Sequence, residues 1–258
     1  MLVLRPGALG DTLLAVPALR VLRAAFGSVT LAAHPSTARL LASVGEVTRG
    51  MAFDDPTLAR LYAAGESCDD MVVAWMAAPP KCAGVMAPSR PPGMDEHCAR
   101  YLLNTLAQLG IDLAFDDRPL RVVPMPSDEV LVHPGSGSPT KNWPADRFAA
   151  VIRVLSAPAT LVVGEADAGA ADQVDAALGR RVKRLEQPSL EELAGRLAGC
   201  HAYLGNDSGV SHLAGLCGAR TVALFGPSNP GVWRPIGPDV RVLSFGANPD
   251  EVAAALLG

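Results

Sequence analysis

Several features that mark large protein classes are missing from this 258-residue sequence. The apolar stretch 13–22 contains Pro17 and Arg20 and is far shorter than the roughly 20 residues of a transmembrane helix. The sequence has neither the G-x-G-x-x-G fingerprint of dinucleotide-binding folds nor the G-K-S/T ending of a P-loop. It also lacks a basic cluster that would neutralise phosphates, and the formal net charge is −4. Nucleic acid is therefore not expected as a partner.

Cysteine and aromatic residues are scarce as well. The five cysteines form no C-x-x-C pair and their number is odd, so we expect reduced thiols rather than a disulfide framework. A strand-like segment at Leu2 stands where a signal peptide would have its charged and apolar regions. Together these features predict a cytoplasmic protein with peripheral membrane contact at most.

What the sequence does have is a regular alternation of short apolar strands with helical patterns. Strands are expected at 2–5, 29–34, 71–75, 129–133, 160–164, 201–205 and 220–226, and the first helix at 10–25. This alternation indicates parallel sheets built from βαβ units. A segment with three prolines and no helical period, DDRPLRVVPMPSDE (116–129), separates two similar halves. We therefore predict two Rossmann-like domains, 1–125 and 126–258, of which the first is reduced.

The first motif that bears on chemistry is RPGALGDTLLAVP (5–17). A strand runs into a turn where Gly7 and Gly10 would let backbone amides approach a ligand closely. Asp11 at the start of the following helix is a candidate general base. The alternative is that Asp11 is only the helix N-cap, whose carboxylate holds the free amides of the first turn.

The second motif is VHPGSGSPTKNWP (132–144). Gly135, Ser136 and further small residues follow a strand end, which favours an anion-binding loop with Lys141 as a point charge. Lys141 would attract a phosphate with roughly 4 kcal/mol per charge pair at about 4 Å and an effective dielectric near 20. The alternative is a surface loop with a solvated lysine.

The third motif is GNDSGVSHLA (205–214), where a strand ends and a helix begins. Asp207 offers a carboxylate for sugar hydroxyls, and Ser208 and Gly209 lie beside free helix amides. His212 stands one turn into the helix; the alternative is that it simply packs in the core.

Other chemistry is disfavoured by the same residues. No second His or Cys lies at metal-ligand spacing, so no metal is expected. A Ser–His–Asp hydrolase would need a G-x-S-x-G elbow, which Gly135–Gly137 does not supply.

With VALFGPSNP (222–230) after them, the three motifs resemble those of glycosyltransferase family 9, the ADP-heptose:lipopolysaccharide heptosyltransferases. The resemblance covers residues 1–30 and most of the second half, whereas 45–125 matches poorly and looks shortened. It implies a GT-B fold, with two domains facing across a cleft and the donor held mainly by the second. It also implies inverting, metal-independent transfer from a nucleotide diphosphate sugar, with an ADP-sugar favoured, to a glycan or glycolipid acceptor in cell-envelope glycan biosynthesis.

The resemblance also suggests roles for individual residues. Asp11 matches the family's general base. The residues that match the donor-binding segments are Gly135, Ser136, Lys141, Asp207, Ser208, Gly209 and His212, with Glu165 as the acid expected to meet the ribose.

Two alternatives remain from the sequence. The shortened first half favours a non-catalytic sugar-nucleotide-binding or scaffold protein. A sugar-nucleotide epimerase of the same fold is the other, but it would need a denser set of acids and histidines around the sugar.

Overall fold

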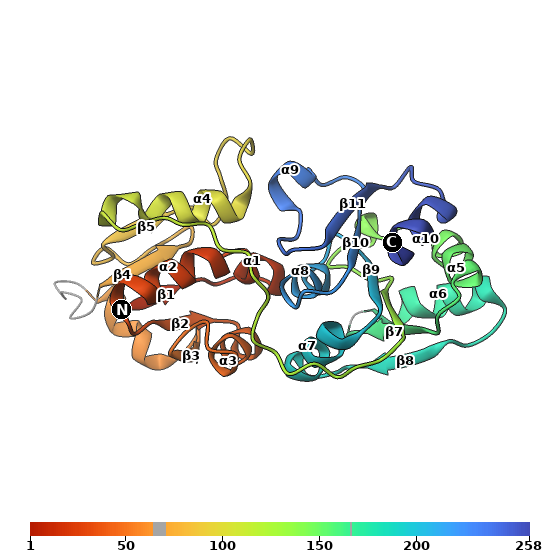
Figure 1. Cartoon of the computed structure of the whole chain (residues 1–258). Helices are drawn as coiled ribbons and strands as arrows, with labels where there is room; N and C mark the ends of the chain where they lie inside the picture. The colour runs from red at the N-terminus through yellow and green to blue at the C-terminus, as the bar shows by residue number, and fades with distance from the viewer. Residues whose placement is uncertain (64–70, 166) are drawn as a thin grey trace. The chain divides into compact units, whose positions relative to one another are not determined.

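The computed structural model describes residues 1–63, 71–165 and 167–258. The chain divides into two compact units, Met1–Asp117 and Arg118–Gly258, drawn from red to yellow-green and from green to blue in Figure 1. The predicted division after residue 125 lies further along the chain. Segment 118–125 hydrogen-bonds to the second unit, from the Leu120 amide to the Leu216 carbonyl (2.7 Å) and from the Met125 amide to the Gly195 carbonyl (2.8 Å).

The first unit is built on a five-stranded sheet of order β3-β2-β1-β4-β5, and its strand pairings are parallel. The strands are β1 (Leu2–Leu4), β2 (Thr30–Ala33), β3 (Arg49–Ala52), β4 (Val72–Trp75) and β5 (Val85–Ala87). The helices are α1 (Leu9–Leu13), α2 (Val16–Phe26), α3 (Pro35–Ser43) and α4 (Cys98–Asn104), with 3-10 turns η1 (Pro56–Tyr62) and η2 (Thr105–Leu109).

Local sequence explains where this unit departs from expectation. The helix predicted over 10–25 is two helices, α1 and α2, and Pro17 takes an N-terminal position of the second, where its missing N–H costs nothing. Strand β3 was not predicted because RGMA carries little apolar pattern. A Cβ on Gly50 would lie 2.3 Å from the Ala38 carbonyl oxygen, so glycine is what lets α3 pack directly onto β3.

The second unit is built on a six-stranded sheet of order β11-β10-β9-β6-β7-β8, again with parallel pairings. The strands are β6 (Val130–His133), β7 (Ala159–Val163), β8 (Lys183–Glu186), β9 (Ala202–Asn206), β10 (Thr221–Phe225) and β11 (Val240–Ser244). The helices are α5 (Ala145–Val154), α6 (Ala168–Leu178), α7 (Leu190–Gly199), α8 (Gly209–Leu216), α9 (Pro230–Trp233) and α10 (Pro249–Leu257), with a 3-10 turn η3 (Pro139–Lys141).

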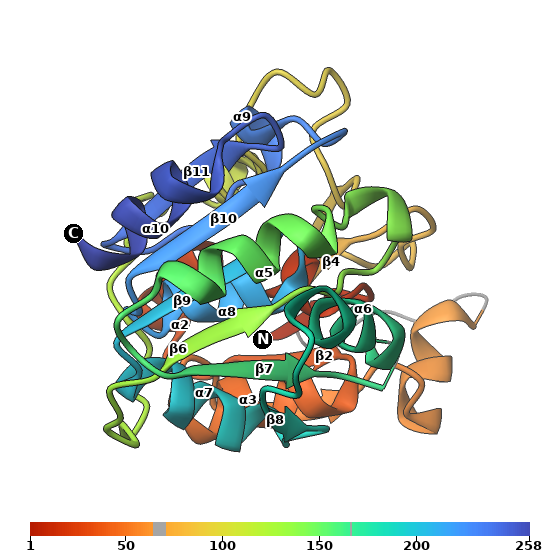
Figure 2. The same cartoon turned by 90° about the vertical axis from the view of Figure 1, so that its right-hand side faces the viewer.

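Helices cover both faces of this second sheet. Helices α5, α6 and α10 pack in a row on one face, and α7 and α8 pack against each other with α8 against β9 and β10; Figure 2 shows the first face. Because both faces are covered, strands β6, β9 and β10 are buried throughout, as parallel sheets require. A Trp143–Phe148 edge-to-face pair (5.2 Å between ring centroids) anchors α5 to the core.

Strand order fixes where a ligand site can form. In each unit the chain adds strands on one side of the first strand and then crosses to its other side. The switch point, where this reversal occurs, lies between β1 and β4 in the first unit and between β6 and β9 in the second. Ligands of open α/β sheets bind outside the carboxyl ends of the strands at such points. The residues there are Arg5 and Trp75 in the first unit, and His133 and Asn206 in the second.

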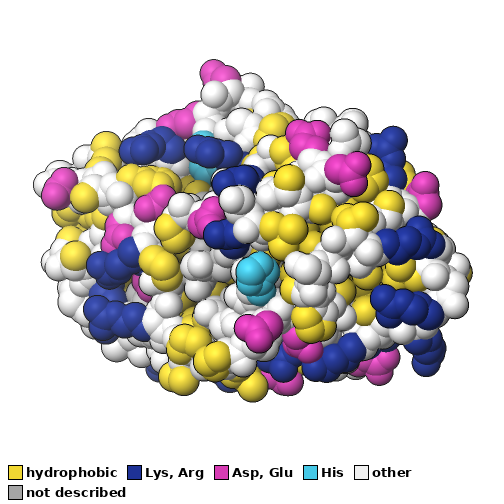
Figure 3. Space-filling model, turned by 45° about the vertical axis from the view of Figure 1, so that its right-hand side comes forward, with side chains coloured by type: hydrophobic (Ala, Val, Ile, Leu, Met, Phe, Trp, Pro, Cys, Tyr) yellow, Lys and Arg dark blue, Asp and Glu magenta, His cyan; other side chains and the backbone are white. Residues whose placement is uncertain are grey.

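Two further expectations meet the structure here. Cys98, Cys200 and Cys217 are free thiols, but Cys82 is disulfide-bonded, so the prediction of reduced cysteines is wrong for this residue. Along the described parts of the chain, none of the helices combines the length and the apolar character needed to cross a membrane. Acidic and basic side chains are intermingled over the face in Figure 3.

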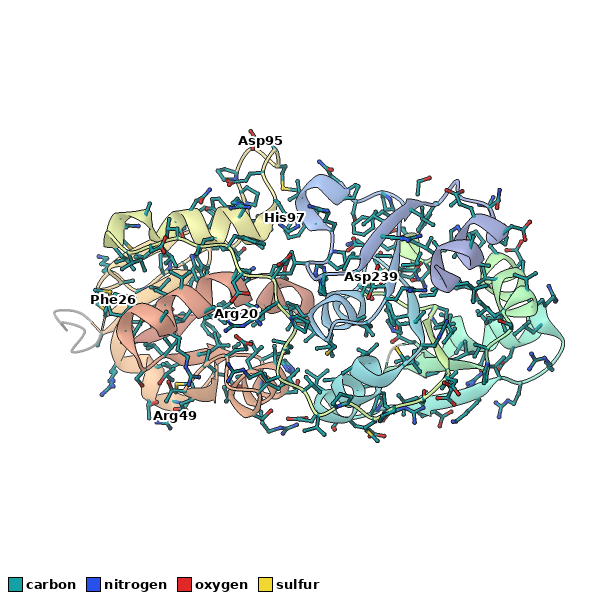
Figure 4. All side chains as sticks on the ribbon, viewed as in Figure 1. Arg20, Phe26, Arg49, Asp95, His97 and Asp239 are labelled. Carbon is teal, nitrogen blue, oxygen red and sulfur yellow. The ribbon has the colours of Figure 1, made fainter. Side chains whose placement is uncertain are left out.

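A buried ion pair makes a stability prediction for the first unit. Arg20, labelled on α2 in Figure 4, contacts the Glu46 carboxylate through Nε and Nη2, both at 2.8 Å, and the two side chains are 5% and 7% exposed. Glu46→Ala removes both of these charge-assisted contacts from a buried guanidinium, which keeps its contact with Asp116, and should lower the free energy of unfolding by about 3 kcal/mol. Urea denaturation measures this loss. Asp172→Ala, which removes a 62% exposed carboxylate, is the control and should cost less than about 1 kcal/mol; equal losses would contradict the account.

Candidate functional site

A single buried asparagine organises the switch point of the second unit. Asn206, at the end of β9, is fully buried. Its Oδ1 accepts the Trp143 amide (2.9 Å), and its Nδ2 donates to the carbonyls of Pro134 (2.8 Å) and Gly135 (3.3 Å). The loop that follows β6 is therefore fastened near both of its ends to the neighbouring strand. This fixes the position of the residues between them.

The fastened loop brings Lys141 to Asp207. Lys141 Nζ lies 2.7 Å from Asp207 Oδ2, and the side chains are 36% and 8% exposed. Asp207 stands between the end of β9 and the start of α8, so its carboxylate lies at the carboxyl edge of the sheet. The pair thus joins a partly exposed cation to a nearly buried anion at the switch point, where a ligand could contact both.

A chain of hydrogen bonds runs beneath this pair. His133 Nε2 lies 2.9 Å from Asp167 Oδ2, and His133 Nδ1 lies 3.3 Å from Ser208 Oγ. Ser208 is the N-cap of α8 and accepts the Ser211 amide. Ser211 Oγ donates to the Asn206 carbonyl (2.5 Å) and meets the Tyr203 hydroxyl at 3.1 Å.

The electrostatics of this chain follow from burial and hydrogen bonding. The hydrogen bond from His133 lowers the pKa of Asp167, with the Gly164 amide helping and burial opposing. Burial raises the pKa of Tyr203 well above its usual range. Asp167 is therefore the charged acceptor at one end of the chain and Tyr203 a neutral phenol at the other.

Two glycines make room for the Asp167 carboxylate. A Cβ on Gly135 would lie 2.1 Å from Asp167 Oδ1, and one on Gly164 would lie 2.6 Å from Asp167 Oδ2. The contact distances leave no space for a side chain at either position. Gly135, predicted as part of an anion loop, is needed here for close approach of an acid to the backbone.

In the first unit, Asp11 sits at the other switch point. Its carboxylate Oδ2 accepts the Ala8 amide (3.3 Å), and its backbone carbonyl accepts two bonds from the buried Arg5 guanidinium, which also donates to the Trp75 carbonyl (3.5 Å). Burial lowers the pKa of Arg5, while the negative charge of Asp11 opposes the shift. The N-cap of α1 is Ala8, so Asp11 is the third helical residue and not the N-cap itself. Its carboxylate nevertheless reaches back to hold an amide at the helix start, as the capping alternative expected.

The predicted residues separate into those that meet and those that do not. Lys141, Asp207 and Ser208 come together at the edge of the second sheet, with Gly209 opening α8. Ser136 turns inward to the Ser138 carbonyl and to Asn142 Oδ1 (2.7 Å). His212 is buried on α8, and Glu165 is exposed in the turn after β7. Gly10 and Asp11 belong to the first unit.

Sequence reasoning missed His133 and Asp167 as members of the site. The strand expected at 129–133 ends at His133, and no motif of the sequence singles out Asp167. The available signal was position, since His133 ends β6 beside the switch point and Asp167 follows the neighbouring strand β7. In the described ranges 1–63, 71–165 and 167–258, no three His, Cys, Asp or Glu side chains form a group suited to a metal ion.

The comparisons with known proteins agree with this geometry. The family model for glycosyltransferase family 9 (heptosyltransferase) matches residues 100–254, more than half of the chain. The chain belongs to glycosyltransferase family 9. Among curated proteins, lipopolysaccharide heptosyltransferase 2 of Salmonella typhimurium is 32% identical over 113 residues. That match spans 41% of this chain and only 32% of the relative's length.

Solved structures of family 9 proteins share the fold. A family 9 glycosyltransferase from Veillonella parvula has a TM-score of 0.76 at 22% identity. The match covers 94% of this chain and 85% of the Veillonella chain. The E. coli heptosyltransferase WaaC, determined with ADP, has a TM-score of 0.71 at 18% identity. The match covers 98% of this chain and 94% of the WaaC chain. The prediction of a GT-B type chain with two Rossmann-like domains, the first smaller, is confirmed.

The His133–Asp167 contact gives a pH prediction. Because the pKa of Asp167 is lowered in the folded protein, its contribution to stability is present above the unfolded value of roughly 4 and is lost as pH falls through the folded value. Urea midpoints measured from about pH 6 to 3 should therefore fall less steeply for Asp167→Asn than for the wild type. Identical slopes would mean that the contact does not form in solution; Asp250→Asn, in the first turn of α10, is the matched control.

Proposed function

We propose that this family 9 chain is an inverting, metal-independent glycosyltransferase. It would move a sugar, with heptose the first candidate, from a nucleotide diphosphate donor to a hydroxyl of a glycan or glycolipid. The observation that carries the proposal is the Lys141–Asp207 pair at the switch point of the second sheet. A cation for the diphosphate and a carboxylate for the sugar lie together there, beside the first turn of α8.

The donor side belongs to the second unit. The ammonium of Lys141 and the free amides at the start of α8 supply positive potential for the two phosphates. Asp207 accepts hydrogen bonds from sugar hydroxyls, which a carboxylate binds more strongly than a neutral group does. In this proposal Gly135 and Ser136 belong to the donor loop, Gly209 and the buried His212 to the donor helix, and Glu165 meets the ribose. An ADP-sugar is favoured because the heptosyltransferase neighbour WaaC was determined with ADP.

The acceptor side belongs to the first unit, with Asp11 as the general base and Gly10 in the backbone that approaches the ligand. Its carboxylate takes the proton of the acceptor hydroxyl, the hydroxyl oxygen attacks the anomeric carbon, and the bond to the diphosphate breaks on the opposite face. Arg5 holds the Asp11 backbone carbonyl, and the Ala8 amide holds the side-chain carboxylate. The positive charge that stabilises the leaving diphosphate comes from Lys141 and the α8 amides, which is why we propose metal independence.

The cellular setting is part of the same proposal. An enzyme that uses a nucleotide-sugar and a glycolipid acceptor in cell-envelope glycan biosynthesis would work in the cytoplasm, with peripheral membrane contact at most. A non-catalytic binding role would keep the donor side and lose the transfer step, so product analysis separates the two.

Lys141→Ala should weaken donor binding. The substitution removes a charge-assisted contact to the diphosphate and leaves the Asp207 carboxylate unpaired beside it, so we expect the dissociation constant of ADP-glucose to rise by about 10- to 100-fold. Isothermal titration calorimetry measures this change.

The matched control for that experiment is Lys183→Ala. Lys183 also pairs with an acid in the second unit, Glu129, but is 62% exposed on β8, and its removal should leave the dissociation constant unchanged. An unchanged constant in Lys141→Ala would remove Lys141 from the donor site.

Asp11→Asn should separate binding from chemistry. The amide cannot accept the acceptor proton, so we expect turnover to fall by about 10² or more with a nearly unchanged dissociation constant for the donor. Sugar transfer measured by mass spectrometry, with the exposed Asp54→Asn as control, tests this. Retained transfer by Asp11→Asn would remove Asp11 as the base, and a wild-type product that is an epimer would replace the proposed reaction.

A further inference from the structure

With a neutral His133, the following arrangement of protons gives each donor and both ring nitrogens a partner in the buried chain beneath the Lys141–Asp207 pair. Each hydroxyl has a single proton to donate. The Ser211 proton goes to the Asn206 carbonyl, so the Tyr203 hydroxyl must donate to Ser211 Oγ, and Ser208 does not receive a bond from Ser211 Oγ. Asp167 is ionised and only accepts, so a neutral His133 donates from Nε2.

This leaves His133 Nδ1 as an acceptor. The Ser208 hydroxyl, 3.3 Å away, gives this nitrogen a donor, while its other acceptor within reach is Ser211 Oγ at 3.4 Å. Ser208 Oγ also accepts the Ser211 amide. In this state Ser208 Oγ has one hydrogen-bonding position left, and that position is a lone pair. A lone pair there can accept a hydrogen bond but repels a phosphate oxygen. This conflicts with the position of Ser208 at the start of α8, where backbone amides favour an anion.

Protonation of His133 reverses the arrangement. An imidazolium donates from both ring nitrogens, so Nδ1–H would bond to Ser208 Oγ while Nε2–H keeps its bond to Asp167. The Ser208 hydroxyl proton is then released from the ring and can turn to Ser211 Oγ, 3.4 Å away, or to the oxygen of an arriving phosphate. The Asp167 carboxylate balances the new charge without moving, because the hydrogen bond between them is already formed.

We propose that His133 is a positioning residue whose uptake of one proton accompanies diphosphate binding and turns the Ser208 hydroxyl into a donor toward the phosphate. This rests on the proposed donor site. The proton comes from solvent, no covalent bond other than those to hydrogen changes, and the imidazolium carries the added charge. The arriving anion and the imidazolium stabilise each other through Ser208.

Other ionisable groups on the elements around His133 are few among the described residues. They are Asp167 after β7, Glu165 in the same turn, Tyr203 on β9, the Lys141–Asp207 pair at the edge, and His212 on α8. Lys141 and Asp207 already neutralise each other, and the pKa of Tyr203 is raised by burial. The group besides His133 that is able to take up a proton near neutral pH is His212, so the experiment must distinguish these two rings.

The experiment is calorimetric titration of ADP-glucose into the full chain in phosphate and in Tris at about pH 8, where a histidine is ordinarily neutral. ADP-glucose is chosen because both of its phosphates are esterified and do not titrate near neutral pH. Proton uptake appears as a difference in binding enthalpy between buffers, and we expect about one proton. The dissociation constant should rise by up to about tenfold per pH unit over the alkaline range. Nitrogen-15 spectra of the histidine rings should show His133 changing from the Nε2–H tautomer to the imidazolium on binding.

Variants separate a proton-linked role from a merely structural one. Asp167→Asn removes the counter-charge and His133→Gln removes the titrating ring, and both should bind ADP-glucose with the buffer dependence abolished. His201→Gln, which changes an exposed histidine before β9, should keep it.

The outcomes are distinguishable. If ADP-glucose binds without proton uptake, or if the spectra assign the proton to His212, the inference about His133 is wrong and the donor site stands. If neither ADP-glucose nor a UDP- or GDP-sugar binds to the wild type, the proposed function itself is wrong.

Discussion

The arrangement of the candidate site in the second unit depends on the side-chain amide of Asn206. Its three hydrogen bonds join the end of β9 to both ends of the loop after β6. Replacing this buried amide would lower stability, because the Trp143 amide and the Pro134 and Gly135 carbonyls would each lose a hydrogen bond in the core. The Lys141–Asp207 contact exists because this loop is held. Sheet topology puts the two strand ends side by side, and Asn206 converts that adjacency into a defined arrangement.

Charges at the switch point of the second sheet are paired within the protein. Lys141 lies against Asp207, and Asp167 lies against His133. A ligand anion at this edge must therefore share Lys141 with an existing carboxylate, so binding depends on what else the ligand offers. In the proposed complex, the sugar hydroxyls would donate to Asp207 while the diphosphate contacts Lys141. An isolated phosphate would contact Lys141 but offer no hydroxyl to Asp207. This arrangement would therefore favour a nucleotide-sugar over a free anion.

The sequence predicted the parallel α/β architecture and the three loops that carry the chemistry, because strand periodicity and glycine-rich strand ends are local signals. It did not predict β3, β5, β8 or β11, whose residues, Val85 apart, are half-buried or exposed. Asp207 and Lys141 were identified as separate candidates and meet through Asn206, whose role is long-range. His133 and Asp167 were missed for the same reason: their contact spans two βα turns, and no local pattern encodes it. Asp11 was identified by its place after a strand, but its helical position was misjudged because Ala8 is an unusual N-cap.

The most direct test of the account is amide hydrogen exchange with and without ADP-glucose. The central claim is that the diphosphate lies at the carboxyl edge of the second sheet between β6 and β9. The account predicts added protection in the loop 134–143 and in the first turn of α8, with little change at β8 and α10. Protection confined to β8 and α10, or absent from the loop and α8 under saturating ligand, would contradict it.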